Sequence, residues 1–89
     1  MKTNDTLKNL YLGNNNFGND GVKYISEALK ESKSIKLLSL NSNNFDNDGF
    51  NHVENFVLNN DNIEKVLLLN NNIGEEMKTI YKKDSRFAL

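Results

Sequence analysis

The chain has 89 residues, a formal net charge of −1 and no cysteine, and its basic and acidic residues are spread along the sequence. This length allows one domain at most, and the near-neutral charge argues against nucleic acid or an anionic membrane as a partner. The lack of cysteine excludes a disulfide framework and a thiolate metal site, and no apolar run is long enough to predict a membrane span. We expect a soluble, unprocessed protein, cytoplasmic or, if it is delivered to another cell, intracellular there.

A threefold internal repeat is the main feature of the sequence. The segments 7–17, 35–45 and 63–73 each carry aliphatic residues at their first, fourth and sixth places, and their starts are 28 residues apart. The alternation at the fourth and sixth places predicts a short strand with one buried face at the start of each repeat. Because a long excursion follows each strand, the three strands are expected to lie parallel.

The excursions between the predicted strands carry apolar residues at helical spacing. The stripe comprises Val22, Ile25, Ala28 and Leu29 in the first repeat and Phe50, Val53, Phe56 and Val57 in the second. Each set would share one face of a helix. Asp20 and Asp48 stand where a helix N-cap would be useful, so we predict that they cap the two helices.

Asparagine fills about a fifth of the chain, and much of it falls at repeated places. Asn15, Asn43 and Asn71 occupy the same place directly after each predicted strand. A turn there leaves backbone donors and acceptors that need partners, and an asparagine amide can both donate and accept. We interpret these three residues as a structural ladder; direct contact with a ligand is the alternative.

The first repeat reads Leu-x-x-Leu-x-Leu-x-x-Asn-x-Phe, and a glycine follows four residues later, before the predicted helix. This pattern resembles the ribonuclease-inhibitor-like class of leucine-rich repeats. The resemblance covers about residues 7–81. It implies an α/β solenoid with three parallel strands on a concave side and helices on a convex side, in a single domain of residues 1–89 with repeats at about 7–34, 35–62 and 63–89. Members of this class bind many unrelated proteins, and a few stimulate a GTPase.

The third repeat departs from the pattern. Met77 replaces the glycine of the first two repeats, and Lys78, Asp84 and Ser85 stand where those repeats have apolar helix residues. A polar helix face cannot be buried against another repeat without cost, so we predict a short helix that acts as a C-terminal cap. Phe87 and Leu89 would fold back over the last repeat or form a frayed terminus.

The other end of the chain begins with six mostly polar residues, and nothing there resembles a capping helix. An unpaired strand edge beside an uncovered apolar end invites contact with another chain. Two interpretations fit: the chain is part of a longer repeat protein, or this end is closed by self-association, for example a homodimer through the N-terminal edge, or by a partner.

Residues that alternate with the core positions of each strand would point to the concave face. They are Asn9, Tyr11 and Gly13, then Leu37, Ser39 and Asn41, then Lys65, Leu67 and Leu69. We predict that Tyr11, Leu37, Leu67 and Leu69 supply affinity for a protein partner and that Asn9, Asn41 and Lys65 give polar selectivity; Ser39 completes the predicted partner-binding set. The alternative is that these are ordinary scattered apolar residues on a small protein surface.

No motif in the sequence indicates catalysis, a cofactor or a metal. The stretches 16–27 and 44–55 resemble calcium loops but lack ligands at required places, and His52 is the only histidine. We therefore expect a non-catalytic protein-interaction module without a cofactor. The alternatives are a self-assembling structural unit or fragment of a larger repeat protein and, less favoured, a regulator of a small GTPase.

Overall fold

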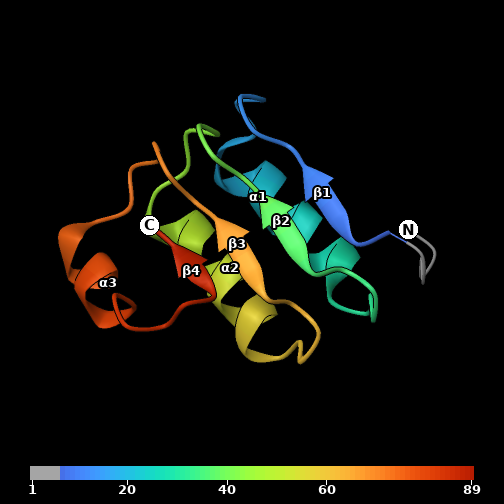
Figure 1. Ribbon diagram of the computed structural model, residues 1–89. Coiled ribbons are helices and arrows are strands. Elements are labelled where there is room, and N and C mark those ends of the chain that lie inside the picture. Colours follow the sequence, from blue (N-terminus) through green and yellow to red (C-terminus); the bar gives the residue numbers. More distant parts are fainter. Residues whose placement is uncertain (1–6) are drawn as a thin grey trace.

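The computed structural model describes residues 7–89 and has an α/β architecture (Figure 1). Its elements in chain order are β1 (Asn9–Tyr11), α1 (Gly18–Leu29), β2 (Leu37–Ser39), α2 (Asn47–Leu58), β3 (Lys65–Leu67), α3 (Glu75–Ile80) and β4 (Phe87–Ala88). The α/β class is confirmed, and the predicted strand segments contain β1, β2 and β3.

The four strands form one parallel sheet in the order β1-β2-β3-β4. Leu10, Leu38, Val66 and Phe87 are neighbours across it. Three parallel strands were predicted, and the fourth was not. The last crossover, from residue 66 to residue 87, is shorter than the two before it, because α3 has 6 residues whereas α1 and α2 each have 12.

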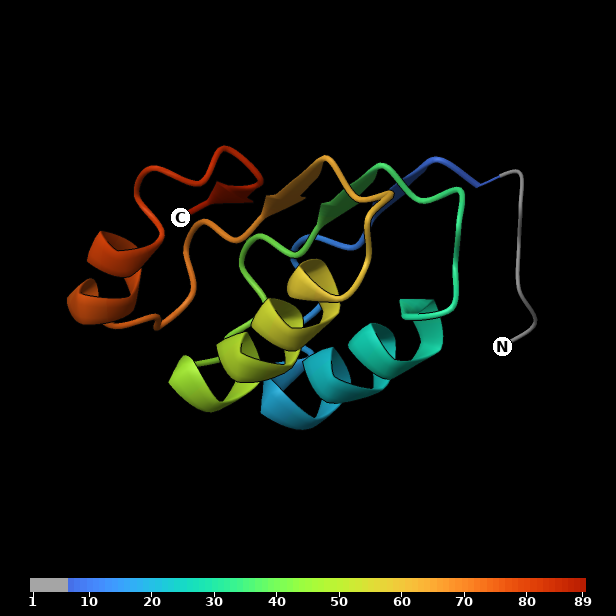
Figure 2. The same cartoon turned by 90° about the horizontal axis from the view of Figure 1, so that it is seen from below.

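The helices cover only one face of the sheet. Figure 2 shows the strands in one layer and α1 and α2 side by side in a second layer, while α3 lies at the end of the molecule that carries the C-terminus. Within residues 7–89, no element covers the opposite face of the sheet.

The core is centred on the second repeat, residues 35–62. Its fully buried apolar residues are Ile35, Leu38, Leu40, Phe45, Phe50, Val53 and Val57. The equivalent first-repeat residues Leu10, Leu12 and Phe17 are only half-buried. The difference follows from position, because the second repeat has a neighbour on both sides and the first has a neighbour on one side among the described residues.

The predicted apolar stripe is confirmed in α2 and is partly wrong in α1. All four predicted residues of α2 are buried. In α1, Val22 and Leu29 are buried and Ile25 is half-buried, but Ala28 is exposed and Ser26 is buried instead. Ala28 is equivalent to Phe56, which lines the junction with α1, and no helix precedes α1 in residues 7–89 to cover Ala28 in the same way.

The predicted N-caps are wrong because both helices begin earlier than expected. The cap of α2 is Asp46, whose carboxylate accepts a hydrogen bond of 2.9 Å from the Asp48 N–H. At the equivalent place the first repeat has Gly18, which has no side chain, and α1 follows Phe17 without a side-chain cap. Asp20 and Asp48 lie in the first helical turns, where a negative charge favours the positive end of the helix dipole.

The end of the chain folds back onto the sheet, as the first of the two alternatives predicted. Phe87 is only 6% exposed, and its ring lies 5.7 Å from that of Phe50 and 4.5 Å from that of Tyr81, measured between centroids. Leu89 is half-buried against the same core. The short third helix is also confirmed: α3 buries no residue, and its Lys78 stays partly exposed.

Candidate interaction surface

The uncovered face of the sheet carries the residues that the sequence predicted as contacts. Because successive strand residues alternate between faces, and because Leu38 and Val66 point to the core, their neighbours point away from the helices. We call this surface the open sheet face; its residues are Asn9, Tyr11, Leu37, Ser39, Asn41, Lys65, Leu67 and Leu69. The strand register places Tyr11, Ser39 and Leu67 in one row across it.

The apolar members of the open sheet face differ in exposure. Tyr11 is 67% exposed and Leu69 is 46% exposed, whereas Leu37 and Leu67 are half-buried. Ser39 is only 6% exposed, between Tyr11 and Leu67 in the same row. A partner would therefore meet the larger side chains on either side of Ser39 before it reached the serine.

Two polar residues of the open sheet face already have intramolecular partners. Asn41 Oδ1 accepts a hydrogen bond of 2.7 Å from the Leu69 N–H, and Lys65 Nζ donates one of 3.1 Å to the Ser85 carbonyl. An ammonium group has three donors, so Lys65 keeps donor capacity for a partner. Asn9 is exposed at the start of β1.

The strand β4 extends the open sheet face by one residue that the sequence analysis missed. Ala88 is the register neighbour of Leu67 and continues the row of Tyr11 and Ser39. The aliphatic pattern of the repeat does not recur around Ala88, so periodicity could not reveal it.

Asn43 joins the first and second repeats through its buried amide. Its Oδ1 accepts hydrogen bonds from the Asn15 N–H at 2.9 Å and from the Phe17 N–H at 3.4 Å. Its Nδ2 donates to the Leu12 carbonyl at 2.8 Å and to the Asn41 carbonyl at 3.3 Å. The side chain thus satisfies backbone groups of two consecutive turns at once.

Asn71 repeats this arrangement one repeat further on. Its Oδ1 accepts from the Asn43 N–H at 2.8 Å, and its Nδ2 donates to the Leu40 carbonyl at 3.0 Å. Asn15, at the exposed end of the series, donates through Nδ2 to the carbonyls of Leu12 and Gly13, within its own repeat. All three amides hold backbone turns.

A second series of asparagines joins the helix starts, and the sequence analysis did not identify it. Asn19 Oδ1 accepts from the N–H groups of Asp46 at 3.0 Å and Gly49 at 3.1 Å. Asn47 Oδ1 accepts from the Gly74 N–H at 2.8 Å in the same way. The available signal was the 28-residue spacing of Asn19 and Asn47. Gly49 allows this close approach, because a Cβ there would lie 2.6 Å from Asn19 Oδ1.

Left-handed backbone explains a further part of the asparagine content. Asn14, Ser42 and Asn70 occupy one repeated place, three residues after the end of each strand, and have φ values of 61°, 58° and 61°. Asparagine tolerates this conformation better than most residues other than glycine.

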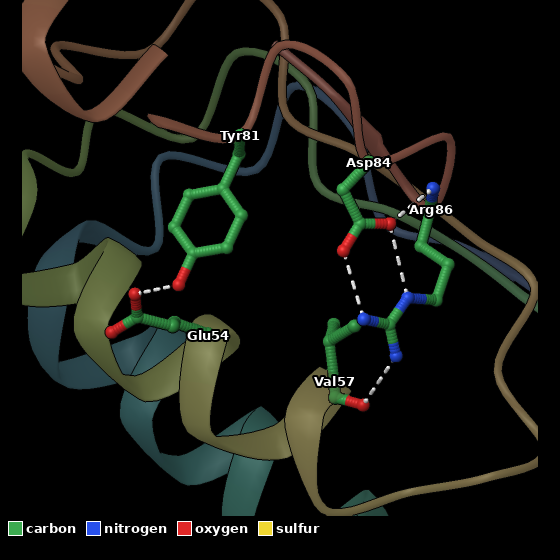
Figure 3. Close-up of polar contacts among 5 residues, drawn as sticks. All are labelled: Glu54, Val57, Tyr81, Asp84 and Arg86. Atoms are coloured by element: carbon green, nitrogen blue, oxygen red, sulfur yellow. Dashed lines mark hydrogen bonds and ion pairs between the residues drawn. The ribbon is translucent and has the colours of Figure 1, made fainter. Parts of the chain in front are cut away.

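Polar contacts fasten the end of the chain to α2, as Figure 3 shows. The Tyr81 hydroxyl donates to the Glu54 carboxylate. Arg86 pairs with Asp84 at 2.8 Å and donates to the Val57 carbonyl at 3.3 Å. Hydrogen bonds from Arg86 hold the pKa of Asp84 below its ordinary value, despite the opposing effect of desolvation.

Tyr81 gives the stability of the chain a dependence on alkaline pH. The hydrogen bond to Glu54, followed by desolvation, raises the pKa of Tyr81 to about 12 from the ordinary 10.0. The folded chain therefore holds this proton more tightly than the unfolded chain. Its contribution to stability is fully present below pH 10.0 and is lost as the pH rises through about 12.

We therefore expect Tyr81→Phe to be less stable than the wild type at neutral pH, with a difference that shrinks as the pH rises from 10.0 to about 12. The measurement is the free energy of urea unfolding for both chains over this pH range. Tyr24→Phe, at an exposed tyrosine of α1, is the matched control and should follow the wild type. A constant difference between Tyr81→Phe and wild type would contradict the assignment.

The remaining polar groups of the described chain form no metal site. Within residues 7–89, no group of three or more histidine, cysteine or acidic side chains is placed to hold a metal ion. Both stretches compared with calcium loops contain the start of a helix, α1 or α2, in place of a continuous loop. His52 is half-exposed and lines a groove of about 380 Å³ between α1 and α2, together with Glu27, Lys30 and Glu31.

No helix in the described part of the chain combines the length and apolarity needed to cross a membrane. The chain matches no model of a known protein family and no curated protein.

Proposed function

We propose that the chain is a leucine-rich-repeat protein of the ribonuclease-inhibitor-like class and a non-catalytic interaction module that binds a protein partner through the open sheet face and the neighbouring strand edges. The observation that carries this proposal is the group of apolar side chains on the open sheet face, with Tyr11 67% and Leu69 46% exposed. The parallel strands and the asparagine hydrogen bonds between turns support the repeat class.

Exposed apolar side chains on a rigid surface suit protein recognition. Tyr11, Leu37, Leu67 and Leu69 can be buried by a partner without any rearrangement of the sheet, and aromatic and aliphatic anchors carry much of the binding energy in protein interfaces. Lys65 and Asn9 lie beside them and would select for polar groups on the partner. The open sheet face holds no constellation of nucleophile, base and orienting group.

The test is affinity capture of protein partners with wild-type chain and with the double variant Leu37→Ser/Leu67→Ser as bait. A partner retained by the wild type should be lost from the double variant, with affinity reduced at least about tenfold, because two interface leucines are replaced. The matched control is Leu58→Ser, which removes an exposed leucine of α2, away from the open sheet face, and should bind like the wild type. Equal capture by the double variant would place the binding site elsewhere.

Self-assembly is the second candidate function, because one observation favours it. Leu10, Leu12 and Phe17 of the first repeat are only half-buried, unlike their equivalents in the second repeat. This end of the structure can be covered by another chain without use of the open sheet face.

A further inference from the structure

The two junctions between consecutive repeats contain the same three hydrogen bonds. At the first junction, Leu12 N donates to Ser39 O, Asn14 N to Asn41 O and Asn15 N to Asn43 Oδ1, each at 2.9 Å. At the second, Leu40 N donates to Leu67 O at 2.8 Å, Ser42 N to Leu69 O at 2.9 Å and Asn43 N to Asn71 Oδ1 at 2.8 Å. Each junction therefore joins three donors of one repeat to three acceptors of the next.

The two ends of the structure carry the two halves of this junction. By repeat equivalence, the acceptors at the outer edge of β1 are Tyr11 O, Gly13 O and Asn15 Oδ1, and the donors at the far end are Leu68 N, Asn70 N and Asn71 N. Gly13 O accepts from Asn15 Nδ2 at 3.1 Å and can accept a second bond, as Asn41 O accepts from both Asn14 N and Asn43 Nδ2 in the first junction. Among residues 7–89, Asn15 Oδ1 accepts no hydrogen bond, and the N–H groups of Asn70 and Asn71 donate none. Leu68 N donates to Ala88 O at 2.8 Å, so β4 fills one of the three places.

The two ends of the structure are also complementary in charge and in apolar surface. The Lys36 N–H donates to the Lys8 carbonyl at 2.7 Å and the Glu64 N–H to the Lys36 carbonyl at 2.8 Å, so these residues stack from one repeat to the next. A further repeat in this register would place Lys8 of a second copy beside Glu64. Both side chains are exposed and have opposite charges. The half-buried Leu10 and Phe17 of that copy would be covered as Leu38 and Phe45 are.

We propose that this surface takes a second copy of the chain, head to tail, with the first repeat of one copy replacing β4 at the end of the third repeat of the other. The incoming repeat brings a strand of 3 residues and a helix of 12, whereas β4 has 2 residues. The burial of Phe87 against Phe50 and Tyr81 opposes the exchange, so association is weak and requires high concentration. Such a head-to-tail contact leaves one free end on each side of a dimer, so a third copy can add to it, and it is independent of any partner on the open sheet face.

The test is sedimentation velocity of the full chain up to the highest concentration that stays in solution. The mass should rise past that of the dimer. Phe87→Leu, which shortens the side chain that holds β4 in place, should strengthen association roughly fivefold. A chain that stays monomeric throughout, or one that stops at a dimer, would overturn the proposal.

Charge reversal at two exposed residues tests the direction of docking without touching the core. Lys8→Glu and Glu64→Lys should each weaken self-association by roughly two- to fivefold, because like charges then meet at every contact. An equal mixture of the two variants restores opposite charges at both kinds of contact and should recover wild-type association. Failure of the mixture to recover, with both variants folded by circular dichroism, would show that Lys8 and Glu64 do not meet and would refute the head-to-tail register.

Discussion

Replacing Phe50 by alanine is expected to lower the free energy of unfolding by about 3–5 kcal/mol. Phe50 is fully buried in α2, and its ring lies 5.6 Å from that of Tyr81 and 5.7 Å from that of Phe87. The substitution therefore removes a core side chain and the surface on which the end of the chain rests. A chain of this size has a total stability of roughly 4–13 kcal/mol, so the loss is a large share of the total.

Urea denaturation followed by circular dichroism measures this loss. Tyr24→Ala is the matched control, because it removes an aromatic ring of α1 that is 68% exposed. It should change stability by less than about 1 kcal/mol. A loss at Phe50 no larger than the loss at Tyr24 would mean that the aromatic contacts of the C-terminal segment contribute little.

The second large effect is expected at Asn43. Asn43→Ala should lower the free energy of unfolding by about 2–4 kcal/mol, although the side chain is polar and belongs to a turn. Asn43 is 0% exposed, and its amide satisfies backbone groups of Leu12, Asn15, Phe17 and Asn41. Alanine leaves the N–H groups of Asn15 and Phe17 without an acceptor inside the protein, where water does not readily replace the amide. The Leu12 and Asn41 carbonyls each lose one of their two donors.

Two further variants separate this explanation from a simple loss of packing. Asn15→Ala changes the equivalent residue at the exposed end of the series and should cost only about 0.5–1.5 kcal/mol. Asn43→Asp keeps the shape and the acceptor but replaces the donor that faces the Leu12 carbonyl with an oxygen. Thermal and urea unfolding should rank Asn43→Asp near Asn43→Ala. A stable Asn43→Asp chain would argue against the hydrogen-bond explanation.

The repeated elements could be predicted because their signal is local. Alternating aliphatic residues define a strand within six positions, and the helical spacing in α2 identifies its buried face without knowledge of its neighbours. The residues of the open sheet face follow from the same alternation. The exposure of these residues does not follow from the alternation, since Ser39 is buried between Tyr11 and Leu67 of the neighbouring repeats.

The predictions that failed depend on position within the stack. Ala28 is exposed because no helix of the described chain precedes α1, and Gly18 cannot cap a helix as the equivalent Asp46 does. The strand β4 forms where a shortened crossover returns to the sheet. The length of this crossover depends on how the end of the chain packs, and the repeat pattern does not predict it. The 28-residue spacing of Asn19 and Asn47 indicated their role at the junctions, but many other asparagines in the chain made this signal hard to distinguish.

The identity of the two junctions also bears on how long such a chain can be. Since each junction uses the same three hydrogen bonds between turns, a 28-residue unit inserted between repeats would meet the same turn partners on either side as the existing units do. Within residues 7–89, the series is interrupted after α3, where the chain returns to the sheet too early for another full unit. The contacts of the central repeat do not depend on the number of repeats. Duplication of a repeat could therefore lengthen the chain without requiring a new type of contact.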